Sequence, residues 1–388
     1  MIEDVDLSIN TAPKIHFLNL AKEFANLGFS VCGILPQPQK KLDFDINGLP
    51  FKIIFTPTPF QNIRIVGNIL KCFLQFPVIT KELIKGPKLV YIRFFPLAII
   101  PCLWISLIKK IFCKTTIKVI GEVNGWIPDE WKVNGAPLWR IIFVKYLLKY
   151  STYFVDNLLA VTPGTKNIFI RETGIDSNKI FVVGNGTDIE HFKPINKKKA
   201  KGVIGLNSNL LVVGFIGYLA KWQGIENFIN CIPIVLKQNP NVSFLIVGDG
   251  PELQQLKKKA KQLDMADNVI FTGEILYEQV PIYVNSFDIA VAPKVGLGEI
   301  GFSSLKVRDY AACGIPIIAS RVKGMELIQE YGIGILVGSE NYQAWADTIL
   351  MLLKNPQKRK EMGRKARTFA EHNFSWKIIA EAIIKEVF

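Results

Sequence analysis

The sequence predicts an α/β protein made of two doubly wound domains, each with a parallel sheet covered by helices. The chain has 388 residues, more than a single hydrophobic core usually organises, and 49% of them are hydrophobic. Short apolar runs alternate with helical segments along both halves, which is typical of βαβ units with parallel strands. Glycine follows most strands of the second half, at the strand ends where such sheets bind ligands.

The first half, residues 1–195, is predicted to form one Rossmann-like domain. Its first helix spans Lys14–Asn26 and ends at Gly28, a residue type that commonly closes helices. The predicted strands of this half are Phe29–Leu35, Phe51–Phe55, Leu89–Phe94, Ile117–Ile120, Leu158–Val161 and Ile180–Val183.

The second half restarts the alternation after a lysine-rich stretch, Lys193–Lys201, that we interpret as a linker. The second domain is predicted over residues 202–372. Its strands are Leu211–Ile216, Phe244–Val247, Val269–Phe271, Ile289–Ala292 and Ile315–Ala319. The strand ends expected to face a ligand are Gly217, Gly248–Gly250, Gly273–Glu274, Pro293–Gly301 and Ser320.

Cysteine and histidine usage indicates a cytosolic protein without a metal site. The cysteines are scattered, without a C-x-x-C pair, at positions Cys32, Cys72, Cys102, Cys113, Cys231 and Cys313. We expect reduced, mostly buried thiols. The three histidines, His16, His191 and His372, have no spacing typical of metal ligands. The first ten residues carry three acids and no basic region, so we predict no signal peptide and a cytoplasmic location.

The formal net charge of +14 calls for an anionic partner or a solvated surface. Basic clusters occur at Lys109–Lys110, Lys197–Lys201, Lys257–Lys261 and Lys358–Arg367. No nucleic-acid-binding motif is present, so nucleic acid is not an expected partner. Two interpretations stay open: peripheral contact with the anionic inner face of the plasma membrane, or solvated helix faces. The apolar run Phe94–Ile108 is too short to span a membrane and contains two prolines, so we predict a buried or interfacial helix.

The stretch Ala290–Ser320 (AVAPKVGLGEIGFSSLKVRDYAACGIPIIAS) is the most informative part of the chain. A buried strand leads into a glycine-rich loop, Ser303 is placed as the N-cap, and a helix is predicted from Ser304 to Ala312. Free backbone N–H groups and the positive end of the helix dipole make such a junction an anion site. Lys306, Arg308 and Asp309 lie in the first two turns, within reach of a phosphorylated ligand.

These residues resemble the donor-binding segment of the retaining GT-B glycosyltransferases of family 4. The shared positions are Ser303, Leu305, Lys306, Asp309, Tyr310, Ala312, Gly314, Pro316, Ala319 and Ser320. Further segments resemble the same family: Gly184–Asp188 with Phe192 and Pro194, Gly214–Gly217, Val247–Glu252, and Phe374–Trp376. The resemblance implies the GT-B layout, two Rossmann-like domains facing each other across a cleft, with residues 373–388 as a helix crossing back to the first domain.

The resemblance also implies a donor site for a nucleotide-diphosphate sugar, expected to be UDP-linked, with no other cofactor and no metal. Lys306, Lys221 and the amides of Ser303 and Ser304 would hold the diphosphate, and Asp309 would accept hydrogen bonds from the ribose. Contacts to the donor sugar are assigned to Glu299 or the backbone near Gly298–Phe302. The base would be framed by Gly273, Glu274 and Ile275, and the remaining nucleotide-binding positions are Gly217, Gly248, Gly301 and Leu305.

On the acceptor side, Glu122-Val123-Asn124-Gly125 follows a strand end and resembles the family's E-x-N-G loop. Glu122 is therefore predicted to orient the acceptor hydroxyl or act as a base, and a loop cap is the alternative. His16 and Arg93 are candidate neighbours. The acceptor would be a polysaccharide, lipopolysaccharide or glycolipid. We expect Glu122, Lys221, Glu299 and Asp309 to carry catalysis.

The chain departs from the family pattern at several positions. Tyr218 and Gln223 stand where many members have arginine and lysine, and Gly301 stands eight residues before Asp309, where an acid is common. The family's central first strand should precede Asp6, but MIEDV is short and acidic, so either the sheet is incomplete or the start codon is misplaced. These departures leave two alternatives to the enzyme: a catalytically degenerate GT-B partner of another transferase, and a sugar-nucleotide epimerase.

Overall fold

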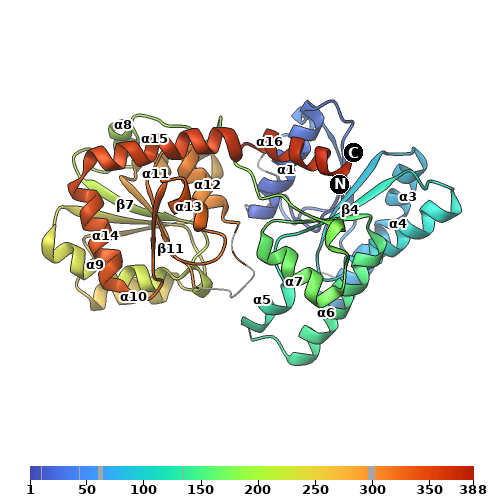
Figure 1. Cartoon of the computed structure of the whole chain (residues 1–388), viewed down its shortest axis with the longest axis horizontal. Helices are drawn as coiled ribbons and strands as arrows, with labels where there is room; N and C mark the ends of the chain where they lie inside the picture. Colours follow the sequence, from blue (N-terminus) through green and yellow to red (C-terminus); the bar gives the residue numbers. More distant parts are fainter. Residues whose placement is uncertain (10, 43, 60–63, 134, 296–300, 302) are drawn as a thin grey trace. The chain divides into compact units, whose positions relative to one another are not determined.

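The computed structural model describes the chain except residues 10, 43, 60–63, 134, 296–300 and 302 (Figure 1). The chain divides into two compact units: unit 1 comprises Met1–Gly184 with Ile379–Phe388, and unit 2 comprises Asn185–Ile378. The sequence placed the end of the first domain at residue 195, whereas residues 185–195 group with unit 2. Both units are α/β with parallel sheets, so the predicted fold class is confirmed.

The described residues of unit 2 form a six-stranded parallel sheet in the order β12-β11-β10-β7-β8-β9. The strands are β7 (Leu211–Ile216), β8 (Val242–Val247), β9 (Val269–Gly273), β10 (Ile289–Ala292), β11 (Ile317–Ser320) and β12 (Gly334–Val337). Chain order runs outward from β7 in one direction and then from β10 in the other. The strand order reverses between β7 and β10, and we call this place the reversal point of the sheet. In doubly wound sheets, the carboxyl ends of the strands beside the reversal point form the ligand crevice.

Alternate residues of the unit 2 strands face two separate helix layers. Val213, Phe215 and Ile289 pack in a core with helices α9 (Ile225–Gln238), α10 (Leu253–Gln262) and α14 (Tyr342–Lys354). The neighbouring strand residues pack in a second core with α11 (Val280–Ser286), α12 (Leu305–Ala312), α13 (Glu326–Glu330) and α15 (Pro356–Asn373). Burial on both faces explains why these strands are continuous apolar runs (Figure 1).

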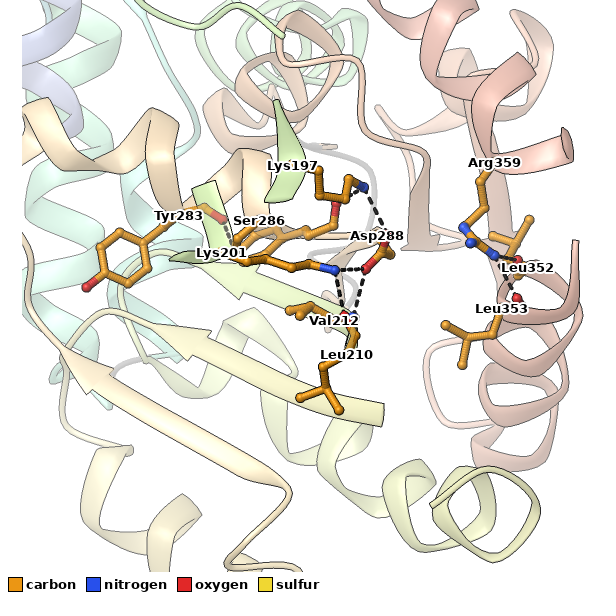
Figure 2. A network of polar contacts seen from close by, with 11 residues as sticks. Lys197, Lys201, Leu210, Val212, Tyr283, Ser286, Asp288, Leu352, Leu353 and Arg359 are labelled. Atoms are coloured by element: carbon orange, nitrogen blue, oxygen red, sulfur yellow. Dashed lines mark hydrogen bonds and ion pairs between the residues drawn. The ribbon is translucent and has the colours of Figure 1, made fainter. Parts of the chain in front are cut away.

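The predicted linker Lys193–Lys201 is wrong over its second half, because Lys197–Val203 forms helix α8. Asn196 caps the helix by accepting a hydrogen bond from the Lys199 amide. Lys201 is buried, and its ammonium donates to Asp288 Oδ2 at 2.7 Å and to the Leu210 carbonyl at 2.6 Å. Figure 2 shows Lys197 and Lys201 converging on the Asp288 carboxylate. The lysines therefore fasten this segment to the sheet of unit 2.

Unit 1 contains strands β1 (Cys32–Pro36), β2 (Lys52–Thr56), β3 (Leu89–Arg93), β4 (Lys118–Val123), β5 (Asn157–Ala160) and β6 (Ile180–Val182). β1 pairs with β2, and β3 to β6 pair in sequence order, all in parallel. Ile2 bridges Ile34 of β1 and Ile92 of β3, also in parallel. The expectation of a short first strand is therefore confirmed: among the described residues no strand precedes β1, and Ile2 alone joins the two ladders as an isolated bridge. The order β2-β1-Ile2-β3 matches the order β9-β8-β7-β10 of unit 2.

Backbone hydrogen bonds hold this short central segment on both sides. The Ile2 amide donates to the Tyr91 carbonyl at 2.8 Å, and the Arg93 amide donates to the Ile2 carbonyl at 3.1 Å. On the other side, the Ile34 amide donates to the Met1 carbonyl at 2.8 Å. Ile2 and Glu3 are buried, so the acidic composition of the segment does not keep it at the surface.

The helices of unit 1 are α1 (Ala12–Asn26), α2 (Arg64–Leu74), α3 (Phe76–Ile84), α4 (Ile99–Ile111), α5 (Ile127–Val133), α6 (Leu138–Ser151) and α7 (Pro163–Thr173). The last helix of the chain, α16, spans Trp376–Val387, and its residues from Ile379 onward group with unit 1. The apolar helix predicted at Phe94–Ile108 begins five residues later, after Pro96. Among the described residues, no helix is long and apolar enough to cross a membrane.

Candidate functional site

The strand ends at the reversal point of unit 2 carry a pair of lysines. Lys306, in the first turn of α12, reaches back to the end of β7, where a Cβ on Gly217 would lie 2.7 Å from its Nζ. Gly217 has φ +139°, a backbone conformation that L side chains rarely adopt. Glycine at this position therefore lets the lysine lie directly against the strand end.

Lys294 follows β10 and meets Lys306 at a shared acceptor. Lys306 Nζ donates to Gln223 Oε1 at 2.9 Å, and Lys294 Nζ donates to the same oxygen at 2.7 Å. Aromatic rings flank both ammonium groups: Phe215 lies 3.9 Å from Lys306 Nζ and Trp222 lies 4.1 Å from Lys294 Nζ. Two lysine amino groups thus lie side by side in a partly apolar environment.

Burial destabilises the charged form of both lysines. It lowers the pKa of Lys294 to about 7, and that of Lys306 well below its usual value, with the neighbouring Lys294 charge lowering it further. Lys294 is only 3% exposed. A bound anion would reverse both effects, because it supplies the opposite charge and the hydrogen-bond acceptors that the lysines favour in their protonated state.

Ser303 links this helix start to a second sequence motif. The Asn185 amide and its side-chain Nδ2 each donate to Ser303 Oγ at 3.2 Å, and Nδ2 also donates to the Ser303 carbonyl at 3.2 Å. The placement of Ser303 as N-cap is wrong by one residue: Ser304 is the N-cap and the helix begins at Leu305. The Ser303 hydroxyl oxygen therefore accepts hydrogen bonds from Asn185, and these bonds fix the Gly184–Asp188 motif to the start of α12.

Asp309 is held by the same motif, one turn farther along α12. Thr187 Oγ1 donates to Asp309 Oδ1 at 2.6 Å. Burial raises the pKa of Asp309 to about 7, against the Thr187 hydrogen bond and the Arg308 charge, which lower it. Arg308 does not join the lysines: its Nη1 donates to the Ser304 carbonyl at 3.0 Å and its guanidinium lies over the Phe374 ring.

The remaining predicted donor residues are placed as follows. The Gly248 amide donates to the Gly273 carbonyl at 2.9 Å, so these two strand ends lie together. Glu274 is exposed, whereas Ile275 packs against the second core of unit 2. Lys221 is exposed in the 3-10 turn Lys221–Gln223, and it is Gln223 whose side chain contacts Lys306. Gly301 has φ +72°, while Glu299 and Phe302 lie outside the described residues.

The reversal point of unit 1 lies between the Ile2 segment and β3, and a cluster of opposite character surrounds Glu122 at the end of the next strand, β4. The Tyr91 hydroxyl donates to Glu122 Oε2, and Asn124 Nδ2 donates to Glu122 Oε1 at 2.5 Å. His16 Nε2 lies 3.3 Å and Arg93 Nε 3.7 Å from the same carboxylate. These contacts offset the effect of burial, so the pKa of Glu122 is lowered and the group is ionised at neutral pH.

Glu3, directly after the central segment, is the second buried acid of this cluster. Its carboxylate lies 3.7 Å from Arg93 Nη1 and 4.0 Å from His16 Nδ1, and within the described residues its oxygens have no hydrogen-bond partner. Burial raises the pKa of Glu3 to about 8 and lowers that of His16 to about 4. At neutral pH, Glu3 is thus mainly a neutral acid and His16 a neutral imidazole.

A cavity of about 250 Å³ opens beside these groups, within unit 1. Its polar lining includes Glu3, Arg93, Asn124 and Glu130, and apolar walls come from Phe94, Phe169 and other residues. Such a mixture of hydrogen-bonding groups and flat apolar walls suits a small polyhydroxylated ligand. Among the described residues, no group of three histidine, cysteine or acidic side chains is arranged to hold a metal ion.

Comparisons with known proteins agree with this arrangement. Residues 196–369 match the family model described as glycosyl transferases group 1, and residues 14–191 match the model described as glycosyltransferase family 4. The chain belongs to the family 4 glycosyltransferases of the GT-B fold. The resemblance found in the sequence is therefore confirmed over both halves.

Individual relatives are distant. An uncharacterized glycosyltransferase of Methanocaldococcus jannaschii is 30% identical over 228 residues, which are 57% of this chain and 55% of that protein. The capsular polysaccharide biosynthesis glycosyltransferase CapM of Staphylococcus aureus is 25% identical over 68% of this chain and 72% of its own length. This chain thus spans little more than half of the length of the first of these relatives.

Two solved structures share the fold over nearly the whole chain. Sucrose-phosphate synthase of Thermosynechococcus elongatus superposes with a TM-score of 0.77 at 18% identity, covering 99% of this chain and 96% of that one. HepE of Anabaena, solved in complex with UDP-glucose, superposes with a TM-score of 0.75 at 16% identity, covering 99% and 98%.

Two residues of these sites were not assigned from the sequence. Lys294 lies within the strand end predicted at Pro293–Gly301, and the signal for it was a lysine two positions after a buried apolar run. Glu3 had no such signal, because three residues are too few to show the periodicity of a strand. Both residues follow strands that flank a reversal point.

Proposed function

We propose that this protein is a retaining, metal-independent glycosyltransferase that transfers a sugar from a UDP-linked donor to a carbohydrate acceptor. The observation that carries the proposal is the pair of buried lysines, Lys294 and Lys306, at the reversal point of unit 2. As the glycosidic bond breaks, its electron pair moves onto the departing diphosphate. Preorganised cations in a partly apolar environment stabilise that charge more than they stabilise the bound donor.

The donor residues take the roles expected from the family resemblance. Lys306 and the amides at Ser303 and Ser304 contact the diphosphate, and the exposed Lys221 approaches it from the loop after β7. Asp309 accepts hydrogen bonds from the ribose, as its hydrogen-bonded position beside Thr187 allows. The base is framed at Gly273–Ile275, with Gly217, Gly248, Gly301 and Leu305 along the nucleotide. Glu299 or the backbone near Gly298–Phe302 contacts the donor sugar.

The acceptor side of the proposal rests on unit 1. Glu122 is ionised, and its proposed role is to orient the attacking hydroxyl or take up its proton. Its carboxylate is buried and accepts from Tyr91 and Asn124, and Asn124, not Glu122 itself, lines the cavity. The cavity beside it offers Arg93 and Asn124 to further hydroxyls. The acceptor class is a polysaccharide, lipopolysaccharide or glycolipid, in keeping with the capsular polysaccharide pathway in the name of CapM. We place the protein in the cytoplasm, with the inner membrane surface as a partner.

The first test is a calorimetric titration of the full chain with UDP, GDP and ADP, without metal and then with magnesium. We expect UDP to bind without metal and more tightly than the other two. Failure of all three to bind would favour the degenerate partner of another transferase, an alternative suggested by Tyr218 and Gln223 in place of basic residues. Binding of UDP that requires magnesium would contradict the metal-independent mechanism.

The second test follows sugar transfer from UDP-glucose and other UDP-sugars to candidate acceptors. Asp309→Ala should abolish transfer and weaken UDP binding, because the ribose loses its acceptor. The anomeric configuration of the product, read by NMR, decides whether transfer is retaining. Conversion of the donor into another sugar nucleotide in the absence of acceptor would identify an epimerase instead.

A further inference from the structure

Helix α6 of unit 1 has apolar residues on both of its faces. Val144 and Leu148, one turn apart, are buried toward the unit. On the opposite side, Trp139, Phe143 and Tyr146 are 64%, 56% and 53% exposed. Further exposed apolar or aromatic side chains lie along the same helix and the turn after it, at Leu138, Ile142, Tyr150 and Tyr153. A helix with exposed apolar residues opposite its buried face lacks the polar face of an ordinary surface helix, and its charged residues, Arg140, Lys145 and Lys149, are all basic.

Helix α4 packs against α6 and extends this surface (Figure 1). Its exposed residues Leu103, Leu107 and Ile111 recur every four positions, so they form a stripe along one face. Phe112, at its end, is exposed as well. We call the exposed residues of α4 and α6, from Leu103 to Phe112 and from Leu138 to Tyr153, the α4–α6 face.

The two sequence segments that carry the α4–α6 face contain charges of one sign, and the acids paired with them, Glu172 with Lys145 and Asp156 with Lys109, come from outside these segments. Between Glu82 and Glu122 the sequence contains seven lysines or arginines and no acid, and between Glu130 and Asp156 it contains four and no acid. On the helices themselves these include Lys110, Arg140 and Lys149. The Arg140 guanidinium lies 6.0 Å from the Trp139 ring centre, which keeps a cation beside an exposed aromatic side chain.

We propose that the α4–α6 face is a docking surface for a bilayer that contains anionic lipids. Tryptophan and tyrosine concentrate at the level of lipid headgroups, leucine, isoleucine and phenylalanine enter the upper acyl region, and lysine and arginine bind the anionic headgroups. A second copy of the chain fits the surface less well, because a twofold contact would bring its like charges together. This surface would make the contact with the inner membrane surface that the proposed function includes. Vesicle binding can be tested without measuring sugar transfer.

The test is co-sedimentation of the full chain with phosphatidylcholine vesicles, with and without phosphatidylglycerol. The wild-type chain should bind the anionic vesicles and release them at high salt. The variant Trp139→Ser/Phe143→Ser/Tyr146→Ser should bind at least about tenfold more weakly, because the apolar contacts are lost. The control Val203→Ser/Tyr331→Ser alters residues that are 62% and 51% exposed on unit 2, and it should bind as the wild type does.

A charge-matched pair separates this surface from a general effect of net charge. Lys110→Gln/Lys149→Gln should weaken binding by roughly fivefold per removed charge. Lys258→Gln/Lys261→Gln, on α10 of unit 2, lowers the net charge equally and should leave binding unchanged. UDP binding, measured by calorimetry, should be the same in all four variants, which also shows that they fold.

Three outcomes would overturn the proposal. The first is no binding of the wild-type chain to anionic vesicles. The second is an equal loss of binding in the α10 variant, which would assign the attraction to net charge. The third is a dimer, detected by light scattering, that the triple serine variant dissociates, which would assign the face to self-association. None of these outcomes would change UDP binding. Failure of the membrane proposal can therefore be distinguished from failure of the proposed sugar transfer.

Discussion

The two reversal points of this molecule share a strand order and differ in charge. In unit 2, Lys306 of α12 and Lys294 after β10 meet at the amide oxygen of Gln223, in the loop after β7. In unit 1, the Ile2 segment and β3 end at Glu3 and Arg93, and Glu122 of the next strand, β4, lies near Arg93 and His16. The doubly wound topology therefore decides where a site is built, and the side chains at the strand ends decide which chemistry it performs.

This difference matches the needs of the two halves of a group transfer. Paired cations suit a leaving group on which negative charge develops. An ionised carboxylate beside a neutral acid suits a nucleophile that arrives as a hydroxyl and must lose a proton. Substitutions at the two points should therefore affect different steps of the same reaction.

The largest effect is expected from Lys306→Met. The variant keeps the apolar contact with Phe215 but removes the cation closest to the end of β7. We expect the rate of transfer to fall about 100- to 1,000-fold, as for the loss of one charge-stabilising donor. Initial rates at saturating UDP-sugar provide the measurement. Lys258→Met, on an exposed position of α10, is the control, and a similar loss in that variant would contradict the assignment.

The next largest effect is expected from Glu122→Gln, which keeps the shape of the side chain. Transfer should fall about 100-fold because the acceptor hydroxyl loses its carboxylate, while UDP affinity stays unchanged. The two measurements separate the units: a loss of UDP affinity equal to the loss of rate would show that Glu122 does not act on the acceptor side. Glu82→Gln provides a control at a surface ion pair.

A smaller effect is expected from Lys294→Met on the affinity for UDP-glucose. The donor should bind about tenfold more weakly, because one charge-assisted contact to the diphosphate is lost. With a Lys294 pKa of about 7, affinity in the wild type should decline above pH 7, approaching tenfold per pH unit. Calorimetry between pH 6.5 and 9 checks both effects. A decline that persists in Lys294→Met would assign it to another group.

The smallest effect concerns stability, where the two reversal points should respond to pH in opposite directions. Lys294 has a folded pKa of about 7, below its unfolded value, so its destabilising effect is full below pH 7 and is relieved as pH rises toward 10.5. Glu3 has a folded pKa of about 8, above its unfolded value, so it destabilises the fold progressively as pH rises from 4.5 to 8.

Urea unfolding across this pH range measures both slopes. Lys294→Met should stabilise the unliganded protein by about 1–2 kcal/mol at pH 7 and remove the rise at alkaline pH. Glu3→Gln should remove the decline between pH 4.5 and 8. Unchanged slopes in the two variants would show that neither group is perturbed by burial as described.

Much of the fold was predictable because buried parallel strands are continuous apolar runs. The strands of unit 2 from Leu211 to Ala319 were placed within a few residues. Strand β12 (Gly334–Val337) was missed, because glycines at 332, 334 and 338 interrupt its apolar run. Helix α8 was mistaken for a linker, since composition alone cannot show that Asp288 lies opposite Lys201. The positive charge of Lys201 in α8 is compensated by Asp288, which lies 87 positions later in the sequence.

The donor segment was predicted from local sequence, and its partners were not. The Ser303–Asp309 segment carries a helix-start pattern that can be interpreted without the rest of the fold. Its contacts with Asn185 and Thr187 span 118 and 122 positions. Gln223 was noted as a departure from the family, and only the structure shows that its amide oxygen joins Lys294 to Lys306.

The central segment of unit 1 also has a consequence for how this unit opens. Met1, Ile2 and Glu3 join the β1–β2 ladder to the β3–β6 ladder, and α1 with β1 and β2 encloses a small hydrophobic cluster of its own around Phe17 and Leu35. Regions with few links to their surroundings exchange amide protons as separate cooperative units. The β1 and β2 amides should therefore exchange together and earlier than those of β4, and Ile2→Gly should widen that gap.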